Sequence, residues 1–534
     1  MLERVIENWL DKANERTFEV PFCHMLAAEG HTVLHLTRHC AMEMGKDVLS
    51  IAPDGVPCAY QLKGPPGGRI RLWQWRDEIE RQVFGLVTGG IAHPSIPTTL
   101  ANHRAYLVTS CELEEEVIRA IEDMNRSFVR QGRPDCQLRT IVRGELLRRA
   151  RDLETNLWPT DLPDIKELLE MYLEEGDGPL PKTKLAGLIE RVIPQTAEEQ
   201  APGKGKLDRS LASAAVLCAL ALASFSLRSN FWAQIEAWTL YGGYVLGLAE
   251  RYGLAKHIWL PHFAIAEREL YILLVRLSAE LQERSYFVEG SPMTDGLVYG
   301  HRMTVLIGLL SVLALWPSQK DGDERDHNFI REFCQRHTSE MRLWGEGGIP
   351  FIVARFWQGR LNDATPGPDL LLRDLAAQVS RANAPRSTNA LPSPYYDLTD
   401  AISHALGIAE APIRETFAGR SYSLEGLVHL FARRMWRQQM RFLWPDISRV
   451  RFVRFYPPQP ADFFRSRCAQ GITRDVQPHQ TQSWGELLQQ AQESEGACVP
   501  ASAREFPVFV LLYLLVCPYG MNSEVLRWLD GHLA

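Results

Sequence analysis

The order of extended and helical patterns in the first 150 residues most restricts the fold. Short apolar runs predict strands at Thr32–Leu36, Asp47–Ile51, Cys58–Lys63, Ala105–Thr109 and Gln137–Val142. Helical periodicity predicts helices at Arg16–Ala28, Arg71–Val87 and Glu112–Val129. A strand–turn–strand unit followed by helix–strand–helix–strand is typical of an α/β domain, so we expect a mixed sheet flanked by helices.

The pattern changes after about Arg151, where helical periodicity dominates and β-type runs become rare. Two segments rich in Gly and Pro are typical of linkers, 176–205 and 365–394. The sequence therefore predicts an α/β domain followed by a large, mainly helical region. The predicted parts are the α/β domain at 1–152, a helical connector or linker at 153–207, a helical domain at 208–362, a linker at 363–396 and a mainly helical C-terminal domain at 397–534.

Length and charge limit the function as well as the fold. The chain of 534 residues is too long for one ordinary core, and its 46% hydrophobic and 23% charged residues are a globular composition. The net charge of −7 argues against a protein that coats nucleic acid by bulk charge. Residues 1–152 alone are close to neutral, so most of the negative charge belongs to the helical remainder. Any nucleic-acid contact must therefore use a local patch.

The cysteines and the apolar segments indicate a cytoplasmic protein. The ten cysteines are dispersed, without a CxxC pair or zinc-ligand spacing, as expected for reduced thiols. The N-terminal segment is charged and amphipathic and lacks the apolar stretch of a signal peptide. Ser210–Leu227 is uncharged but rich in Ala and Ser, and Met303–Trp316 is too short to span a bilayer. We expect both to be buried helices, and we expect no membrane partner.

One predicted hairpin carries a pattern of residues suited to catalysis. Asp47 opens the first strand, Asp54-Gly55 forms a turn signal, and the second strand ends in Gln61-Leu62-Lys63. Gln61 and Lys63 lie two residues apart, so their side chains face the same side of the sheet. The hairpin brings them near Asp47 at one end of the two strands. Leu62 faces the other side, but its carbonyl can reach a metal ion.

This set of groups fits the hydrolysis of a phosphodiester bond. Mg²⁺ prefers oxygen ligands, usually one or two carboxylates together with phosphate and water, and Mn²⁺ is an alternative. Such a cation lowers the pKa of a bound water and offsets charge on the phosphorus centre. A lysine beside the metal ion can orient the attacking water or stabilise the transition state.

The stretch resembles the PD-(D/E)xK nuclease superfamily and, within it, the Mrr-like restriction endonucleases. In that family an acid lies on one strand and (E/Q)xK on the next, which Asp47, Gln61 and Lys63 match. Glu19 stands where the family has a glutamate on the preceding helix, and Glu43 fits a subgroup with a further acid there. The resemblance covers about the first 150 residues. It departs from the family pattern in two places, Gln61 for the acid of the second strand and Lys46 for proline.

The resemblance implies a restriction-endonuclease-like fold and a Mg²⁺-dependent endonuclease that cleaves DNA. It implies that Asp47 ligates the metal ion, with help from Glu19, Glu43, Gln61 or the Leu62 carbonyl. Lys63 would position the water or offset charge. Fusions of this kind resemble bacterial restriction or antiphage effectors, in which the helical region senses a trigger, associates with itself or docks a protein partner.

Arginines are concentrated in two parts of the chain. Arginine makes bidentate contacts with phosphate, so the first group is a candidate nucleic-acid surface, although a solvated helix face explains it equally well. The first group consists of Arg126, Arg130, Arg133, Arg139, Arg143, Arg148, Arg149 and the adjacent Arg151. The second group, Arg433 to Arg454 with aromatic residues between, is more typical of a helix face, a partner surface or an interdomain surface.

Other interpretations of the predicted hairpin remain open. Asp47 could cap a turn, Lys63 could be a solvated strand end, and Glu19 could be an ordinary helix-face acid. The domain could also be a degenerate nuclease fold that binds nucleic acid or a protein without cutting. The same groups would equally cleave RNA, so an RNA nuclease is a further alternative.

Overall fold

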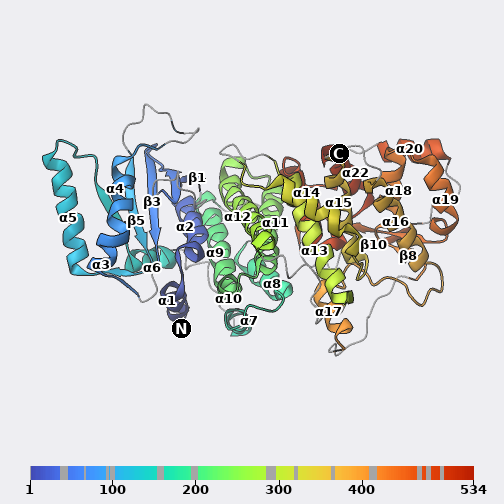
Figure 1. Cartoon of the computed structure of the whole chain (residues 1–534), viewed down its shortest axis with the longest axis horizontal. Coiled ribbons are helices and arrows are strands. Elements are labelled where there is room, and N and C mark those ends of the chain that lie inside the picture. Colours follow the sequence, from blue (N-terminus) through green and yellow to red (C-terminus); the bar gives the residue numbers. More distant parts are fainter. Residues whose placement is uncertain are drawn as a thin grey trace. The chain divides into compact units, whose positions relative to one another are not determined.

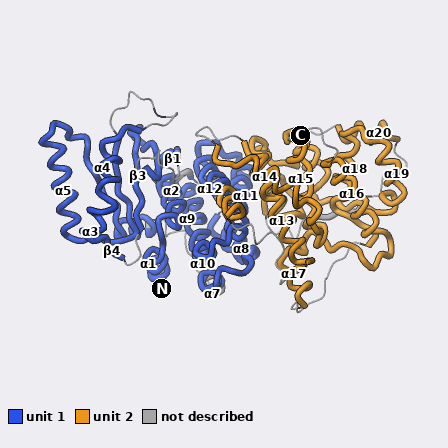
Figure 2. Tube along the Cα trace, in the orientation of Figure 1, with its two compact units in different colours: residues 1–272 blue, residues 273–534 orange. Residues whose placement is uncertain are grey.

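The computed structural model describes most of the chain, in two compact units, residues 1–272 and 273–534 (Figure 2). The residues it describes are 2–35, 46–64, 68–91, 96, 103–152, 162–193, 203–283, 296–317, 323–361, 367–407, 418–465, 472–476, 483–492 and 498–533.

The N-terminal unit contains a five-stranded mixed sheet in the order β1-β2-β3-β5-β7 (Figure 1). The first three strands form an antiparallel meander, whereas β3, β5 and β7 are parallel. The bounds are β1 Thr32–His35, β2 Val48–Ile51, β3 Pro57–Lys63, β5 Arg104–Thr109 and β7 Leu138–Ile141, with a small parallel pair β4 Arg69–Ile70 and β6 Glu112–Leu113. The predicted mixed sheet with flanking helices is therefore confirmed.

Helices cover both faces of this sheet. Leu49, Ala59 and Leu107 pack on one face with the helices that follow β4, in a core that includes buried Trp75. On the other face Phe22 of α2 packs edge-on against Tyr60, with ring centroids 5.4 Å apart. The helices of this part are α1 Leu2–Lys12, α2 Glu15–Ala28, α3 Leu72–Gln74, a π-helical turn Trp75–Ile79, α4 Glu80–Thr88, α5 Glu115–Arg130 and α6 Arg143–Asp152.

Further helices complete the same unit. They are α7 Leu162–Tyr172, α8 Lys182–Val192, α9 Lys204–Ala221, α10 Ala223–Leu227, α11 Phe231–Tyr252 and α12 Lys256–Glu283, which continues past residue 272. Helix α2 of the sheet domain packs along α9. The predicted boundary near residue 152 is therefore not a boundary between compact units. The apolar face of α2 is shared between the sheet and the helices, and this pairing of distant segments leaves no local signal in the sequence.

A buried pair of histidines joins α2 to α12 in this unit. The Nδ1 atoms of His24 and His262 lie 3.0 Å apart, and both side chains are at most 1% exposed. Their rings are stacked, with centroids 5.3 Å apart, and His24 also stacks on Trp238. One Nδ1 must donate and the other accept, so the pair is compatible with two neutral rings. Burial lowers the pKa of both histidines, to about 3 for His262.

We expect the histidine pair to make the N-terminal unit acid-sensitive. Each folded-state pKa lies below the unfolded value near 6.5, so the unfolded chain binds protons first on acidification. The stability that comes from keeping the rings neutral is fully present above about pH 6.5 and is lost as the pH falls toward the folded values, by up to about 1.4 kcal/mol per pH unit for each ring. Hydrogen exchange of α2 and α12 between pH 7.5 and 5 measures this loss.

A matched control separates the pair from general acid effects. His262→Gln is expected to reduce the pH dependence, whereas His257→Gln, at an exposed position of the same helix, is expected to leave it unchanged. An equal pH dependence in wild type and His262→Gln would contradict this account.

The second unit is mainly helical. Its helices are α13 Gly296–Leu315, α14 His327–His337, α15 Ile349–Leu361, α16 Gly367–Ala382, α17 Leu398–Ala405, α18 Leu424–Arg433, α19 Arg437–Ile447, α20 Trp484–Gln492, α21 Pro507–Val516 and α22 Ser523–Leu533. A three-stranded sheet in the order β10-β9-β8 consists of β8 Arg420–Ser421, β9 Arg451–Tyr456 and β10 Ile472–Val476. The mainly helical character predicted for the remainder of the chain is thus confirmed.

The predicted linker at 363–396 is largely wrong, because α16 occupies residues 367–382 and packs on α15. Its Gly-Pro start suggested a loop, yet proline is well tolerated in the first turn of a helix. Leu372, Leu375 and Val379 recur at helical spacing on the buried face. The Gly and Pro residues near the start of the helix led to the prediction of a linker despite this periodicity.

The two apolar segments form buried helices, as predicted. Residues 210–227 lie in α9 and α10, and every residue from Leu211 to Leu222 is buried. Among the described residues, α13 alone is long and apolar enough to cross a membrane, and 72% of its apolar window is buried inside the fold.

Candidate active site

The β2–β3 hairpin places Asp47 opposite Gln61. Val48 pairs with Tyr60, and the backbone N–H of Asp47 donates to the Tyr60 carbonyl at 2.8 Å. The hairpin reverses at Asp54-Gly55, where Gly55 has a φ of +82° that favours glycine. Asp47 and Gln61 are therefore cross-strand neighbours. The turn and the alternation of side chains along the two strands together set this register.

The Asp47 carboxylate is held by two short hydrogen bonds. Its Oδ2 accepts from Gln61 Nε2 at 2.7 Å and from the backbone N–H of Leu62 at 2.7 Å. The predicted meeting of Asp47 with the Gln-x-Lys segment is thus present. Bonds to an ionised acceptor are stronger than neutral ones, so they fix the orientation of this carboxylate. Leu62 contributes its N–H to this contact.

Gln61 has an unused oxygen beside that carboxylate. The side chain is 3% exposed, and its Oε1 is buried without a hydrogen-bond partner among the described residues. A buried acceptor without a donor is costly, and a bound cation would satisfy it. The oxygen donors of Asp47 and Gln61 are of the kind that hard divalent cations prefer. The residues present therefore fit a Mg²⁺ or Mn²⁺ ion.

Lys63 lies at the end of β3 and pairs with an acid from α2. Its Nζ is 3.2 Å from Glu15 Oε1, and the two side chains are 16% and 38% exposed. Gly64 permits this approach, because a Cβ there would lie 2.9 Å from the backbone nitrogen of Glu15. The end of β3 therefore abuts the start of α2, which Asn14 caps through a bond to the Thr17 N–H.

Glu15 was missed by the sequence analysis, which assigned the helix acid to Glu19. The two glutamates lie four residues apart and so share one face of α2. Glu19 is 8% exposed and close enough to Cys23 to raise the pKa of that thiol, after the larger effect of burial. The Asn14 cap and the acid at the first helical position were a usable signal for Glu15. Glu43 lies outside the described residues.

Lys46, next to Asp47, is a buried cation. It is 5% exposed, and its Nζ has no hydrogen-bond partner among the described residues. The ammonium lies beside Gly89, at the C-terminal end of α4, where the helix dipole favours positive charge. Burial lowers the pKa of Lys46. From the sequence, Lys46 was noted only because it stands where the PD-(D/E)xK motif has proline.

The described residues hold no group of three His, Cys, Asp or Glu side chains placed to bind a metal ion. A metal ion at this hairpin would therefore depend on Asp47 together with neutral oxygens such as Gln61 Oε1, or on acids outside the described range. With Gln61 as a neutral ligand, the resemblance requires Glu19 or Glu43 to supply a second carboxylate, and this requirement stays a prediction.

Several arginines of the first basic group are already paired with acids. The group is spread over α5, β7 and α6, and Arg133 and Arg139 lie against the rings of Phe128 and Tyr106. Arg130 is exposed at the end of α5. The ion pairs are Arg126 with Asp123, Arg143 with Asp11, Arg148 with Glu145 and Arg149 with Glu29. Their role in binding nucleic acid stays a prediction.

The second basic group contains arginines that hold the fold together. Arg433 and Arg434 both bond to Asp530, which is 3% exposed, and Arg454 pairs with Glu425. These contacts support the structural reading of that group.

Comparison with known proteins does not assign the chain to a family. No protein-family model, no curated protein and no solved structure matches the chain. The functional assignment therefore rests on the residues of the hairpin and on their arrangement.

Proposed function

We propose that the chain is a metal-dependent endonuclease that hydrolyses DNA phosphodiester bonds. The observation that carries this proposal is the contact of Asp47 with Gln61 and with the Leu62 N–H at one end of the β2–β3 hairpin. Lys63 follows directly at the end of β3, where its Nζ pairs with Glu15. The order and spacing of these residues resemble the PD-(D/E)xK motif of Mrr-like nucleases. The mixed sheet flanked by helices supports the same assignment.

Asp47 and Gln61 would hold the cation, through the carboxylate and through Oε1. A bound Mg²⁺ supplies an activated water and offsets negative charge on the phosphate. The two hydrogen bonds to Asp47 Oδ2 keep the carboxylate in one orientation, so less reorganisation accompanies substrate binding.

Lys63 would act on the phosphate or on the attacking water. Its Nζ is a compact charge with three donors, and Glu15 holds it at the end of β3. The Lys63 side chain is 16% exposed, and a phosphate oxygen would reach the ammonium through this exposed part. Glu15 is accordingly a positioning residue for Lys63.

The helical region would act as the sensor or as the partner-docking module of a cytoplasmic restriction or antiphage effector. This part of the proposal rests on the fusion of the nuclease-like domain to a large helical region. The candidate DNA contacts are the arginines of the first group apart from Arg151, namely Arg126, Arg130, Arg133, Arg139, Arg143, Arg148 and Arg149.

A digestion assay tests the function directly. Purified full-length protein is incubated with supercoiled plasmid, single-stranded DNA and RNA, in Mg²⁺, in Mn²⁺ and in EDTA. We expect plasmid cleavage in Mg²⁺ or Mn²⁺ and none in EDTA, because the water is activated only in the presence of the cation. Cleavage of RNA alone would replace the DNA assignment with a ribonuclease, and cleavage in EDTA would contradict the metal-dependent mechanism.

A non-catalytic binding protein is the second candidate, and one observation favours it. Asp47 Oδ2 already accepts two hydrogen bonds, and the adjacent Gln61 is almost fully buried. Titration of Mg²⁺ into wild type and Asp47→Asn separates the two candidates. The nuclease requires binding that the substitution weakens, whereas equal binding or no binding in both proteins supports the scaffold.

A further inference from the structure

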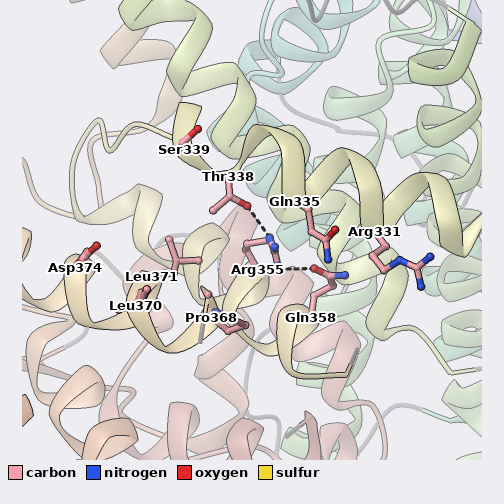
Figure 3. Close-up of a pocket in the computed structure, with 12 residues that line it drawn as sticks. Arg331, Gln335, Thr338, Ser339, Arg355, Gln358, Pro368, Leu370, Leu371 and Asp374 are labelled. Carbon is pink, nitrogen blue, oxygen red and sulfur yellow. Dashed lines mark hydrogen bonds between the residues drawn. The ribbon is translucent and has the colours of Figure 1, made fainter. Parts of the chain in front are cut away.

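A polar pocket lies in the second unit, between α14, α15 and α16 (Figure 3). Its volume is about 640 Å³, within the range of small-molecule sites. Arg331 comes from α14 and Arg355 from α15, while Thr338 and Ser339 lie between these helices. The pocket is far along the sequence from the candidate nuclease residues and has no part in the function proposed above.

Arg355 is a buried cation without a carboxylate partner. It is 8% exposed and forms no ion pair with any acid that the structure describes. Its Nε donates to Thr338 Oγ1 at 2.9 Å and its Nη1 to Gln358 Oε1 at 2.7 Å, as Figure 3 shows. These neutral acceptors orient the guanidinium but do not neutralise it. Burying an unpaired charge is unfavourable, so this position calls for an anion.

Arg325 is a second buried arginine, and it provides a comparison for Arg355. Arg325 and Arg355 are both buried, each with 8% of its surface exposed. Arg325 is neutralised by Asp323, which accepts from its Nε at 2.6 Å. The guanidinium of Arg355 instead borders a cavity. Among the residues that the structure describes, no acid takes the place at Arg355 that Asp323 takes at Arg325.

The surroundings of Arg355 add further donors and little competing negative charge. Arg331 is exposed at the edge of the same pocket, and Ser339 is also a lining residue. Gly367 and Leu370 of the first turn of α16 also line the pocket, and backbone N–H groups of a first turn have no partner within their helix, although Pro368 has no N–H. Asp374 is the one acid among the lining residues, and it is exposed and bonded to Arg373 at 2.9 Å.

Gly359 keeps the pocket in this shape. A Cβ at this position would lie 2.7 Å from Arg355 Nη1 and 2.7 Å from Pro368 Cγ. The absent side chain therefore allows the guanidinium and the start of α16 to approach each other.

We propose that this pocket binds the phosphate group of a small organic phosphate, held by Arg355 and Arg331. A phosphate monoester carries a charge of about −1.5 to −2 at neutral pH, which two guanidinium groups balance. Arginine also matches phosphate oxygens in a bidentate geometry. The apolar side chains of Pro368 and Leu371 line the same pocket and provide a surface for the organic part of the ligand.

Calorimetric titration of the full chain with four compounds tests the site. The compounds are AMP, ribose 5-phosphate, inorganic phosphate and, as an uncharged match to AMP, adenosine. We expect the phosphate compounds to bind and adenosine not to bind. If AMP binds most tightly, the organic part of the ligand is a nucleoside. If ribose 5-phosphate binds most tightly, it is a sugar. Equal binding of all three phosphate compounds would show that the pocket recognises the phosphate alone.

Variants show whether the two arginines carry the binding. Arg331→Gln and Arg355→Gln are each expected to weaken binding tenfold or more. Arg381→Gln, at an exposed arginine of α16 outside the pocket lining, is expected to leave binding unchanged. If Arg355→Gln does not fold, Arg331→Gln and Gly359→Ala provide the same test. The proposal is overturned if none of the phosphate compounds binds at millimolar concentration, if adenosine binds as tightly as AMP, or if binding survives in Arg331→Gln.

Discussion

Replacing Asp47 is expected to abolish metal-dependent cleavage of DNA. Asp47→Asn removes the charge that a divalent cation needs, and the loss should be about 10³-fold or more. Asparagine keeps the shape of the side chain and one oxygen that can accept the Leu62 N–H, so the fold should persist. Asp47→Ala should also abolish cleavage, but it leaves two donors unpaired, each at a cost of about 1–3 kcal/mol. Plasmid nicking, followed with time, measures the loss.

Lys63→Ala is expected to reduce cleavage by about 10²-fold or more, because it removes a charge at the end of β3 that would face the phosphate. Glu15→Gln should have a smaller effect, since it only loosens the position of the lysine. The two effects distinguish a residue that contacts substrate from one that positions it.

The turn of the same hairpin provides matched controls. Asp54 and Arg104 form an exposed ion pair near the turn, away from Asp47. Asp54→Asn and Arg104→Gln therefore remove charges of the same kind and should leave cleavage within about twofold, since water screens an exposed ion pair and neither residue contacts Asp47. Plasmid cleavage in Mg²⁺ by the Asp47→Ala, Lys63→Ala double variant would show that the site lies elsewhere.

Removing the carboxylate of Glu346 is expected to cause the largest loss of stability in the second unit. Glu346 is fully buried in the turn before α15. Its oxygens accept from Asn383 Nδ2 at 2.7 Å, from the backbone N–H groups of Tyr422 and Ser423 at 2.8 and 2.9 Å, and from the Ser423 hydroxyl at 2.8 Å. Glu346→Ala leaves these buried donors without an acceptor. We expect a loss of about 3–5 kcal/mol.

Hydrogen exchange of the segment 418–433 measures this loss, because the amides of Tyr422 and Ser423 lie within it. Glu346→Gln should cost less than alanine, since its carbonyl oxygen still accepts. Asp374→Ala, at an exposed acid of α16, should change protection by no more than about 0.5 kcal/mol. Equal protection in wild type and Glu346→Ala would show that the four contacts are energetically unimportant.

The hairpin was predictable because its signals are local. Asp54-Gly55 specifies the turn, and the alternation along Val48–Ile51 and Cys58–Lys63 specifies the faces. Together they set the register that places Asp47 beside Gln61. The contact of Lys63 with Glu15 was less accessible, because it depends on how α2 crosses the end of β3 and on the space at Gly64.

The units of the chain were harder to predict for the same reason. His24 and His262 touch although 238 residues separate them. Such a contact cannot be predicted from a change in composition or from helical periodicity, because both are local properties of the sequence. The linker at 363–396 was predicted from its Gly and Pro content. Residues 367–382 instead form α16, because their apolar side chains recur at helical spacing and are buried when the helix packs on α15.

The sequence by itself determined the alternation of strands and helices in the first 150 residues, the helical remainder, and the D…QxK hairpin with its expected chemistry. These depend on side-chain period and turn residues over a few positions, and such interactions are largely independent of the rest of the chain. Only the tertiary structure decided that α2 joins the sheet to the helices, that Glu15 meets Lys63, and that Arg355 lines a pocket without an ion pair to any acid in the described part of the chain. Those features depend on which distant surfaces pack together, because burial and charge pairing are properties of the assembled fold.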